Sequence, residues 1–288
     1  MAKLKNINGH FVESDYENAL ISFLEKEGWQ YIFGDSISRA NRKEVLYMDD
    51  LLQFLKDNNK NVKDEELQRI ADNVRLVGAD TDFATLHKVY KWMIDGISAV
   101  NEKGEPVTVR LIDFEKIDNN IFRVVNQFTV EYINNGVTKT RRPDVLLYVN
   151  GIPVCVIELK NPADANATIE DAWEQINIRY WRDIPGLLHY CPLACISDGV
   201  KTRLGTVRTP YEHFYAWRRV ENGDKVSTMP FDELETMVKG VYRPSRFLEI
   251  LRDYVYFQDT NYDSAEKEVV CRYPQFFATR LLRESVIK

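Results

Sequence analysis

Two apolar runs joined by a two-residue turn constrain this chain more than any other feature. The runs are residues 143–149 and 152–160, and Asn150 and Gly151 separate them. Asparagine and glycine tolerate the positive φ angles of a tight turn better than other residues do, so the pattern predicts a β-hairpin. Since the second run is almost wholly apolar, as in a strand that is buried on both faces, we expect this hairpin within a buried sheet.

The rest of the chain predicts an α/β protein with a mixed sheet flanked by helices. Apolar residues recur at helical spacing through most of the first hundred residues, whereas residues 120–133 alternate and are rich in β-branched and aromatic side chains. Helices separate some of the strands, which is typical of a sheet with helices on its faces. We expect helices at residues 14–28, 45–56, 64–77, 83–100, 168–181, 231–240 and 244–257, and further strands at residues 120–133, 192–197 and 212–220. The sheet thus follows a helical N-terminal region and precedes a helical C-terminal extension.

Charge and hydropathy exclude some classes of function. The 288 residues include 38 Lys and Arg against 44 Asp and Glu, so the formal net charge is -6. This balance disfavours sequence-independent coating of nucleic acid or of an anionic membrane, although it permits a local basic groove. The longest apolar runs fall far short of the roughly 20 residues that a membrane helix needs, and the first residues lack the apolar segment of a secretory signal. We therefore expect a cytoplasmic protein with no membrane partner.

The four cysteines are too few and too scattered for a disulfide framework, and they lack the paired spacing of a zinc site. Cys155 and Cys195 stand inside apolar strand-like runs, which favours buried free thiols. An iron–sulfur cluster held by all four cysteines is the alternative.

Three charged residues interrupt the apolar hairpin. Asp144 lies on the first run, and Glu158 and Lys160 stand two apart on the second, so the period of two directs both to one face. A buried strand excludes Glu and Lys unless they are paired or hold a metal. Two carboxylates and the backbone carbonyl of Leu159 offer the hard oxygen ligands that suit Mg²⁺, and a nearby amine can orient water or neutralise charge on a phosphate. The pattern favours phosphodiester hydrolysis, and an edge hairpin with a solvated Glu158–Lys160 ion pair is the alternative.

These residues resemble a known family. The pattern PD…ExK, from Asp144 to Lys160, is that of the PD-(D/E)xK nuclease superfamily. The fuller string RPDVLLYVNGIPVCVIELKNP resembles the N-terminal nuclease domain of the R (restriction) subunit of type I restriction-modification enzymes, and LIDFEKIDNNIFRVVNQF, ISDG, RLGT and RFLEILRDYVYF occur in the expected order. The resemblance covers nearly the whole chain. It implies an endonuclease domain at residues 1–260, with a helical part at about 1–110, a nuclease core at about 120–220 and a helical extension at about 231–257.

The resemblance also implies roles for the charged residues. Asp144 and Glu158 become ligands of a catalytic Mg²⁺, and Lys160 becomes the catalytic lysine. A glutamate from the first helix often stands near the metal in this family, and Glu17 is the candidate in this chain. The alternative role of Glu17 is to complete a helix-capping box with Ser14.

Nucleases of this branch carry a Gln-x-x-x-Tyr pair on the helix after the lysine, and this chain departs from that spacing. Gln175 is followed by Tyr180, five positions later. In an α-helix the extra residue rotates the second side chain by about 100° from the ideal step. We expect Gln175 and Tyr180 to contact DNA or the active site, and an ordinary helix surface is the alternative.

Basic residues occur near the proposed metal site. A few of them could track a phosphate backbone despite the negative net charge, and binding would then be sensitive to salt. The candidates for contacts with double-stranded DNA are Lys139, Arg141, Arg142, Arg179, Arg182, Lys201 and Arg203. Each of them alone is also compatible with a solvated surface charge.

The chain contains no GxxxxGK(S/T) loop, and hence no visible cradle for nucleotide phosphates. Residues 266–282 resemble the opening of the family's helicase-like motor, where Gln275 would face the adenine of ATP. We therefore expect residues 261–288 to be a linker and the start of a truncated motor domain of a much longer subunit. ATP would be a cofactor of that full-length subunit and not of this chain.

The leading hypothesis is a Mg²⁺-dependent DNA endonuclease domain without sequence readout of its own. The resemblance implies that the R subunit translocates DNA with ATP, in a complex with methylation (M) and specificity (S) subunits. A second hypothesis is a module that docks the motor and holds DNA without cutting it. A third is a stand-alone repair or transposon nuclease of the same superfamily.

Overall fold

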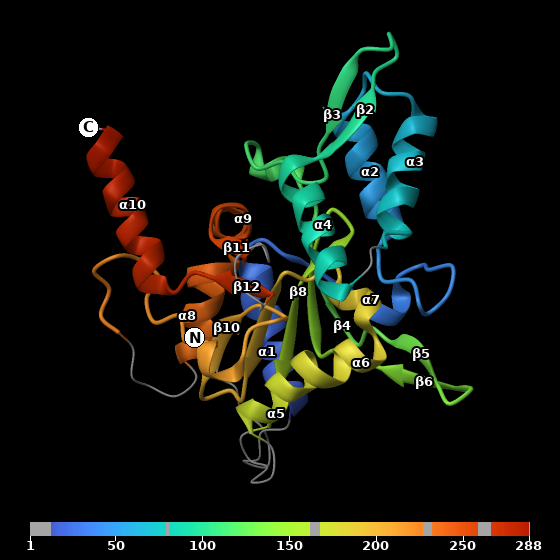
Figure 1. The fold of residues 1–288 in the computed structure, drawn as a ribbon. Helices are drawn as coiled ribbons and strands as arrows, with labels where there is room; N and C mark the ends of the chain where they lie inside the picture. The colour runs from blue at the N-terminus through green and yellow to red at the C-terminus, as the bar shows by residue number, and fades with distance from the viewer. Residues whose placement is uncertain (1–12, 79–80, 162–167, 227–231, 259–265, 288) are drawn as a thin grey trace.

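A central six-stranded sheet organises the molecule (Figure 1). The computed structural model describes residues 13–78, 81–161, 168–226, 232–258 and 266–287. The strand order is β1-β4-β7-β8-β9-β10, in which β1 lies parallel to β4, β8 lies parallel to β9, and the other neighbours are antiparallel. The strands are β1 (Gln30–Phe33), β4 (Phe122–Asn126), β7 (Val145–Val149), β8 (Ile152–Leu159), β9 (Leu193–Ser197) and β10 (Thr202–Gly205). The predicted α/β class with a mixed sheet is confirmed.

Helices surround the sheet, and short hairpins lie outside it (Figure 1). The α-helices are α1 (Glu13–Lys26), α2 (Met48–Asn58), α3 (Asp64–Arg75), α4 (Asp82–Asp95), α5 (Ile169–Glu174), α6 (Trp181–Asp183), α7 (Pro185–Leu188), α8 (Asp232–Met237), α9 (Pro244–Asp253) and α10 (Tyr273–Ile287). The π-helical turns are η3 (Gln175–Tyr180) and η5 (Val238–Tyr242), and the 3₁₀ turns are η1 (Gly34–Ser36), η2 (Ile117–Asn119) and η4 (Tyr211–His213). The hairpin strands are β2 (Ile97–Val100) with β3 (Pro106–Val109), β5 (Val130–Asn134) with β6 (Val137–Arg141), and β11 (Val255–Gln258) with β12 (Lys267–Val270).

The predicted central hairpin is confirmed. β7 and β8 pair antiparallel and are buried along their whole length. Asn150 and Gly151 adopt positive φ angles of 51° and 76°, as a type I′ turn requires. Space also requires glycine at the second position, because a Cβ on Gly151 would stand 2.1 Å from the Tyr47 carbonyl oxygen. The turn therefore packs directly against the residue that precedes α2.

The single strand predicted over residues 120–133 is wrong. This segment divides into β4, which lies in the central sheet, and β5, which pairs with β6. Gln127 lies between the two strands with a φ of 54°, a left-handed conformation that is uncommon for glutamine. Gln127 ends the extended segment and changes the direction of the chain. The alternating sequence pattern does not predict this turn.

The helical N-terminal region is confirmed, but one predicted helix is too long. The helix expected over residues 83–100 ends at Asp95, because Gly96 takes a φ of 81° and residues 97–100 form β2. The sequence pattern also did not reveal β1, a four-residue edge strand beside β4. Short strands hold too few alternating residues for their period to be recognised.

The other helices and strands were predicted with mixed success. The helical segments at residues 168–181 and 231–240 are confirmed where the structure describes them, and each contains a π-helical turn. The strand at residues 192–197 is confirmed as β9. The strand at residues 212–220 is wrong, since this segment holds a 3₁₀ turn and a single bridge from Tyr215 to β10.

The C-terminal segment packs against the preceding residues. The helix predicted over residues 244–257 ends at Asp253, and β11 follows and pairs with β12. The sequence DTNYDSAEKE, residues 259–268, is typical of a linker. Residues 259–265 lie outside the described residues, and residues 267 and 268 belong to β12. On α10, Phe276 is fully buried against the rings of Trp217 and Tyr254. The domain division expected at residue 260 stays a prediction.

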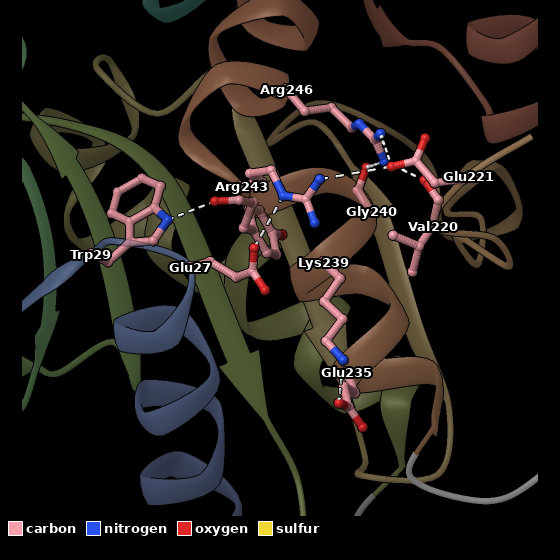
Figure 2. A network of polar contacts seen from close by, with 10 residues as sticks. Glu27, Trp29, Val220, Glu221, Glu235, Lys239, Gly240, Arg243 and Arg246 are labelled. Atoms are coloured by element: carbon pink, nitrogen blue, oxygen red, sulfur yellow. Dashed lines mark hydrogen bonds and ion pairs between the residues drawn. The ribbon is translucent and has the colours of Figure 1, made fainter. Parts of the chain in front are cut away.

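A polar network fixes the C-terminal helices near the end of α1 (Figure 2). Arg246 on α9 is buried and donates a hydrogen bond to Glu221 at 2.8 Å. Arg243 donates to Glu27, just beyond α1, at 3.2 Å. The Trp29 indole donates to a backbone carbonyl oxygen of η5 at 2.6 Å. These contacts hold α1, η5 and α9 together on one side of the sheet.

Helices α1 and α5 cover opposite faces of the central sheet. Asn126, Val145 and Ile157 are partners across β4, β7 and β8, so their side chains share one face. Glu17 on α1 bonds to Asn126 and therefore lies on that face. Glu158 follows Ile157 and points to the other face, where η3 contacts it.

Three cysteines lie within the core. Cys155, Cys191 and Cys195 are buried free thiols, as the sequence predicted, and Cys271 is half-buried. Burial raises the pKa of each thiol, which makes the thiolate scarce. No helix within the described ranges is both long enough and apolar enough to cross a membrane.

Candidate active site

The central hairpin brings Asp144 and Glu158 together at one end of the sheet. Asp144 directly precedes β7 and lies opposite Glu158 in continuation of the β7–β8 register. Its carboxylate accepts a hydrogen bond from the Leu159 backbone amide at 2.7 Å, and its own amide lies 3.4 Å from Glu158 Oε1. The two acidic residues thus stand on adjacent strands, and backbone contacts connect them.

Lys160 shares the face of Glu158, as the period of two predicts. Gln175 connects the two side chains, because its Nε2 donates to Glu158 Oε2 at 2.6 Å and its Oε1 accepts from Lys160 Nζ at 3.0 Å. Glu158 is 0% exposed and β8 is a central strand. The alternative of a solvated ion pair on an edge hairpin is therefore wrong.

A π-helical turn corrects the geometry expected for Gln175 and Tyr180. Residues five apart would diverge in an α-helix, but η3 is wider and places them on the same face. Gln175 Nε2 donates to Tyr180 Oη at 2.8 Å, and Tyr180 Oη donates to Glu158 Oε1 at 2.6 Å. Both side chains reach the acidic residue, so neither belongs to an ordinary helix surface. Their part in DNA binding or catalysis stays a prediction.

Burial dominates the electrostatics of this cluster. Loss of solvent raises the pKa of Glu158 well above its ordinary value, and the neighbouring Asp144 carboxylate raises it further. Lys160 and the Tyr180 hydroxyl act in the opposite direction because they favour the ionised form. Burial also raises the pKa of Tyr180, so its phenol stays a hydrogen-bond donor. Two carboxylates in so poorly solvated a place form an environment that a cation would stabilise.

The oxygen atoms around Asp144 are of the kind that magnesium prefers. Both backbone groups of a strand residue point toward the same neighbouring strand, so the Leu159 carbonyl lies on the side where its amide meets Asp144. Within the described ranges, no three His, Cys, Asp or Glu side chains form a group that could hold a metal. A cation held by Asp144 and Glu158 would therefore need backbone, water or substrate oxygens to complete its coordination.

Glu17 approaches the sheet from the other face. Its carboxylate accepts hydrogen bonds from Asn126 at 2.5 Å and from Gln127 at 3.3 Å. The predicted capping box with Ser14 is wrong, because α1 already includes Ser14. The role of Glu17 near a metal stays a prediction.

Two of the predicted DNA-binding arginines meet at a residue that the sequence did not reveal. Arg141 Nε lies 2.7 Å from Asp183 Oδ2, and Arg182 Nε lies 2.8 Å from Asp183 Oδ1. The hydrogen bonds from Arg182 and then from Arg141 hold the pKa of Asp183 well below its ordinary value. The Asp183 side chain is only 1% exposed. No spacing signal links Arg141 to a residue 42 positions later, since only the packing of α6 beside β6 joins them.

The remaining basic candidates have more varied surroundings. Arg179 forms an ion pair with Glu174 at 3.5 Å, and the guanidinium of Arg203 lies 5.4 Å from the Tyr211 ring centre. Arg179 is exposed to solvent, as are Lys139, Arg142 and Lys201. Contact with DNA stays a prediction for the whole set.

Gln275 lies on α10, far along the chain from the acidic residues. Its Oε1 accepts a hydrogen bond from the Arg272 backbone amide at 2.8 Å. Gln275 and Arg272 line a cavity of about 880 Å³ together with Arg208, Tyr254 and residues of β12. Its contact with adenine stays a prediction for a longer subunit.

The fold and the site define a mixed α/β protein in which a buried hairpin carries two acidic residues and a lysine, connected by a glutamine. Residues 10–213 match the protein family described as "Type I restriction enzyme R protein N terminus". The chain belongs to this family. The resemblance to R subunits is thereby confirmed.

Curated relatives carry names that agree with this family. The chain is 29% identical to the putative type I restriction enzyme MjaIXP endonuclease subunit of Methanocaldococcus jannaschii, across 96% of this chain and 28% of the relative. It is 27% identical to the type I restriction enzyme HindI endonuclease subunit of Haemophilus influenzae, across 96% of this chain and 27% of the relative. The chain thus spans about a quarter of the length of these relatives.

Proposed function

We propose that this chain is the Mg²⁺-dependent endonuclease domain of a type I restriction enzyme R subunit, built as a PD-(D/E)xK nuclease. It would hydrolyse phosphodiester bonds of double-stranded DNA without recognising a sequence by itself. Membership of the family and the names of the relatives support the proposal. The observation that carries it is the contact cluster in which Gln175 joins Lys160 to Glu158, beside Asp144.

Magnesium is the proposed cofactor, and the residues present fit it. The Asp144 and Glu158 carboxylates and the Leu159 carbonyl would hold the ion, because all three supply hard oxygen donors. The burial of Glu158 supports a cation here, since burial alone disfavours the ionised carboxylate. When bound, Mg²⁺ would lower the pKa of coordinated water and stabilise negative charge on the phosphate.

The side chains around the acidic residues would orient the reacting groups and neutralise charge. Lys160 would orient the attacking water or neutralise charge that develops on the phosphate. Gln175 is a positioning residue, because one amide fixes both Lys160 and Glu158. Tyr180 would orient Glu158 through its hydroxyl. Contacts made before substrate binds reduce the reorganisation that the reaction requires.

The full R subunit would supply what this chain lacks. We infer that a motor following this domain translocates DNA with ATP, and that Gln275 contributes to its adenine site. Methylation (M) and specificity (S) subunits would complete the complex, and the specificity subunit would choose the DNA target. The complex would act in the cytoplasm.

The test is plasmid cleavage by the full-length subunit assembled with methylation and specificity subunits, Mg²⁺ and ATP. Lys160→Ala should abolish cutting, whereas ATP-driven translocation should continue because the motor lies elsewhere. Lys103→Ala is the matched control, since Lys103 is an exposed lysine between β2 and β3. Cutting by Lys160→Ala at the normal rate would contradict the assignment.

Metal binding separates a nuclease from a module that docks the motor and holds DNA. In calorimetric titrations with Mg²⁺ or Mn²⁺, the unchanged chain should bind a cation and Asp144→Asn should lose that binding. A docking module should show no binding that depends on Asp144.

A further inference from the structure

The β5–β6 hairpin lies outside the central sheet (Figure 1). Its turn is formed by Asn135 and Gly136, with φ angles of 51° and 76°. At its base, β6 ends at Arg141, three residues before Asp144. A molecule that contacts the base of this hairpin therefore lies next to the acidic residues.

One face of the hairpin is basic. The strand register pairs Tyr132 with Lys139, so alternate residues of β6 share a face with Tyr132. These residues are Val137, Lys139 and Arg141, and the guanidinium of Arg141 lies 5.7 Å from the Tyr132 ring centre. The acidic residue of the hairpin, Glu131, pairs with Thr140 on the opposite face.

The tip of the hairpin exposes apolar side chains. Val137 is 58% exposed on the face of Lys139, and Ile133, which pairs with Thr138, is 62% exposed on the opposite face. Neither side chain belongs to the buried hydrophobic core. A partner surface would explain such residues, since they can make apolar contacts without demanding a pattern of hydrogen-bond donors and acceptors.

The base of the hairpin is fixed and flanked by further positive charge. Arg141 is held by the buried Asp183 carboxylate. The Glu131 backbone amide donates to the Arg42 carbonyl oxygen at 3.0 Å, which places the exposed Arg42 and Lys43 beside the base. The charge around the hairpin thus complements a polyanion, although the whole chain is acidic.

We propose that the β5–β6 hairpin enters the major groove of duplex DNA next to the position that is cut. This inference rests on the proposed function and names the DNA surface of that same site. The major groove is about 12 Å wide and admits a two-stranded β-ribbon. Five residues of strand span about 17 Å, so the tip reaches about five base pairs from the scissile phosphate, at about 3.4 Å per base pair. Lys139 contacts the phosphates, Val137 contacts base edges on the same face, and Ile133 contacts the groove from the opposite face.

The experiment measures binding of a 30-base-pair duplex to the 288-residue chain by fluorescence anisotropy, without Mg²⁺ so that the DNA stays intact. The variant carries Ile133→Thr, Val137→Thr and Lys139→Gln, which keep β-propensity at the tip. The matched control carries Val100→Thr and Lys103→Gln on the β2–β3 hairpin, where Val100 is 51% exposed. The variant should raise Kd at least tenfold and reduce the slope of log K against log salt by about 1. The control should bind as the unchanged chain does.

The outcomes separate this inference from the proposed function. If the unchanged chain binds DNA and the hairpin variant binds within twofold of it, the hairpin inference is overturned and the proposed function stands. If the unchanged chain does not bind DNA, both fail. If the hairpin variant keeps its affinity for DNA but no longer binds the methylation and specificity subunits, the hairpin contacts a protein partner. That result also overturns the hairpin inference. If circular dichroism shows that the triple variant is unfolded, the single variant Lys139→Gln replaces it. An unchanged slope of log K against log salt for Lys139→Gln would then overturn the hairpin inference.

Discussion

Tyr180 donates a hydrogen bond to Glu158 Oε1 at 2.6 Å, from a helix on one face of the sheet to the central strand beneath it. This contact depends on η3, because a π-turn holds one residue more than an α-turn. The five-residue spacing from Gln175 to Tyr180 therefore brings both side chains to Glu158.

Deletion of Ile178 should convert η3 into an α-helical turn and preserve the site. Ile178 is 50% exposed, and its removal leaves Gln175 and the tyrosine four apart, on one helical face. The rate of cleavage should stay within about threefold of that of the unchanged enzyme. The free energy of unfolding, measured in urea, should change by less than about 1 kcal/mol. Deletion of Arg69 from the regular helix α3 is the control, and it should cost several kcal/mol because it rotates buried side chains out of the core. Loss of cleavage without Ile178 would show that the π-turn has a further role.

Tyr180→Phe should damage cleavage as well as stability. The change leaves Glu158 Oε1 without its hydroxyl donor in a buried place, at a cost of about 1–3 kcal/mol. Tyr190→Phe is the matched control, because the Tyr190 hydroxyl is also buried and donates to the Val74 carbonyl oxygen at 2.7 Å. Both variants should lose similar stability in urea unfolding, but only Tyr180→Phe should cut plasmid more slowly. Equal cleavage rates for Tyr180→Phe and Tyr190→Phe would show that the Tyr180 hydroxyl has no part in cleavage.

Gly151→Ala should be far more harmful than Gly136→Ala. Both glycines follow an asparagine in a hairpin turn and have a φ of 76°. A Cβ at Gly151 would stand 2.1 Å from a backbone oxygen, whereas one at Gly136 would meet nothing within 4 Å. We expect a loss of about 1 kcal/mol for Gly136→Ala from backbone strain and several times more for Gly151→Ala. Thermal unfolding checks this, and similar melting temperatures for the two variants would contradict it.

The Asp183 ion pairs should make stability depend on acid pH. The pKa of Asp183 is lower in the folded chain than its ordinary value of about 4. The stabilisation is therefore fully present above about pH 4 and is lost as the pH falls toward the lower folded value. Asp183→Asn should cost about 1–3 kcal/mol at pH 7, and this deficit should shrink below about pH 4. Urea unfolding at several pH values measures it.

The control for Asp183→Asn is Asp64→Asn. The Asp64 side chain is 68% exposed and pairs with Lys56 at 2.6 Å, so its loss should cost less than about 1 kcal/mol. A deficit for Asp183→Asn that stays constant from pH 7 to pH 3 would refute the ion-pair account.

Residue preferences for backbone conformation and burial were enough to predict the central hairpin. They failed where a residue adopts a backbone conformation that is unusual for its type. The apolar runs and the Asn150-Gly151 turn follow from φ preferences and burial, so β7 and β8 were predictable from residue type alone. The left-handed Gln127 was not, because glutamine has no preference that announces such a turn. Strand β1 was also unpredictable, since its pairing with β4 joins residues about 93 positions apart.

The same distinction applies to the site. Asp144, Glu158 and Lys160 lie on one hairpin, so strand periodicity placed them together. Tyr180 was expected to be rotated away from Gln175, because a sequence does not show where a helix widens into a π-turn. Asp183 was missed altogether, since its contact with Arg141 is a product of tertiary packing.

The central claim is that a divalent cation binds at the end of the central hairpin. The most direct measurement is anomalous diffraction from crystals of this chain soaked in Mn²⁺. The account predicts a single strong peak within coordination distance of the Asp144 and Glu158 carboxylates and the Leu159 carbonyl oxygen, and no such peak in Asp144→Asn crystals. Anomalous density that is absent from this position, or that persists there in the Asp144→Asn variant, would contradict it.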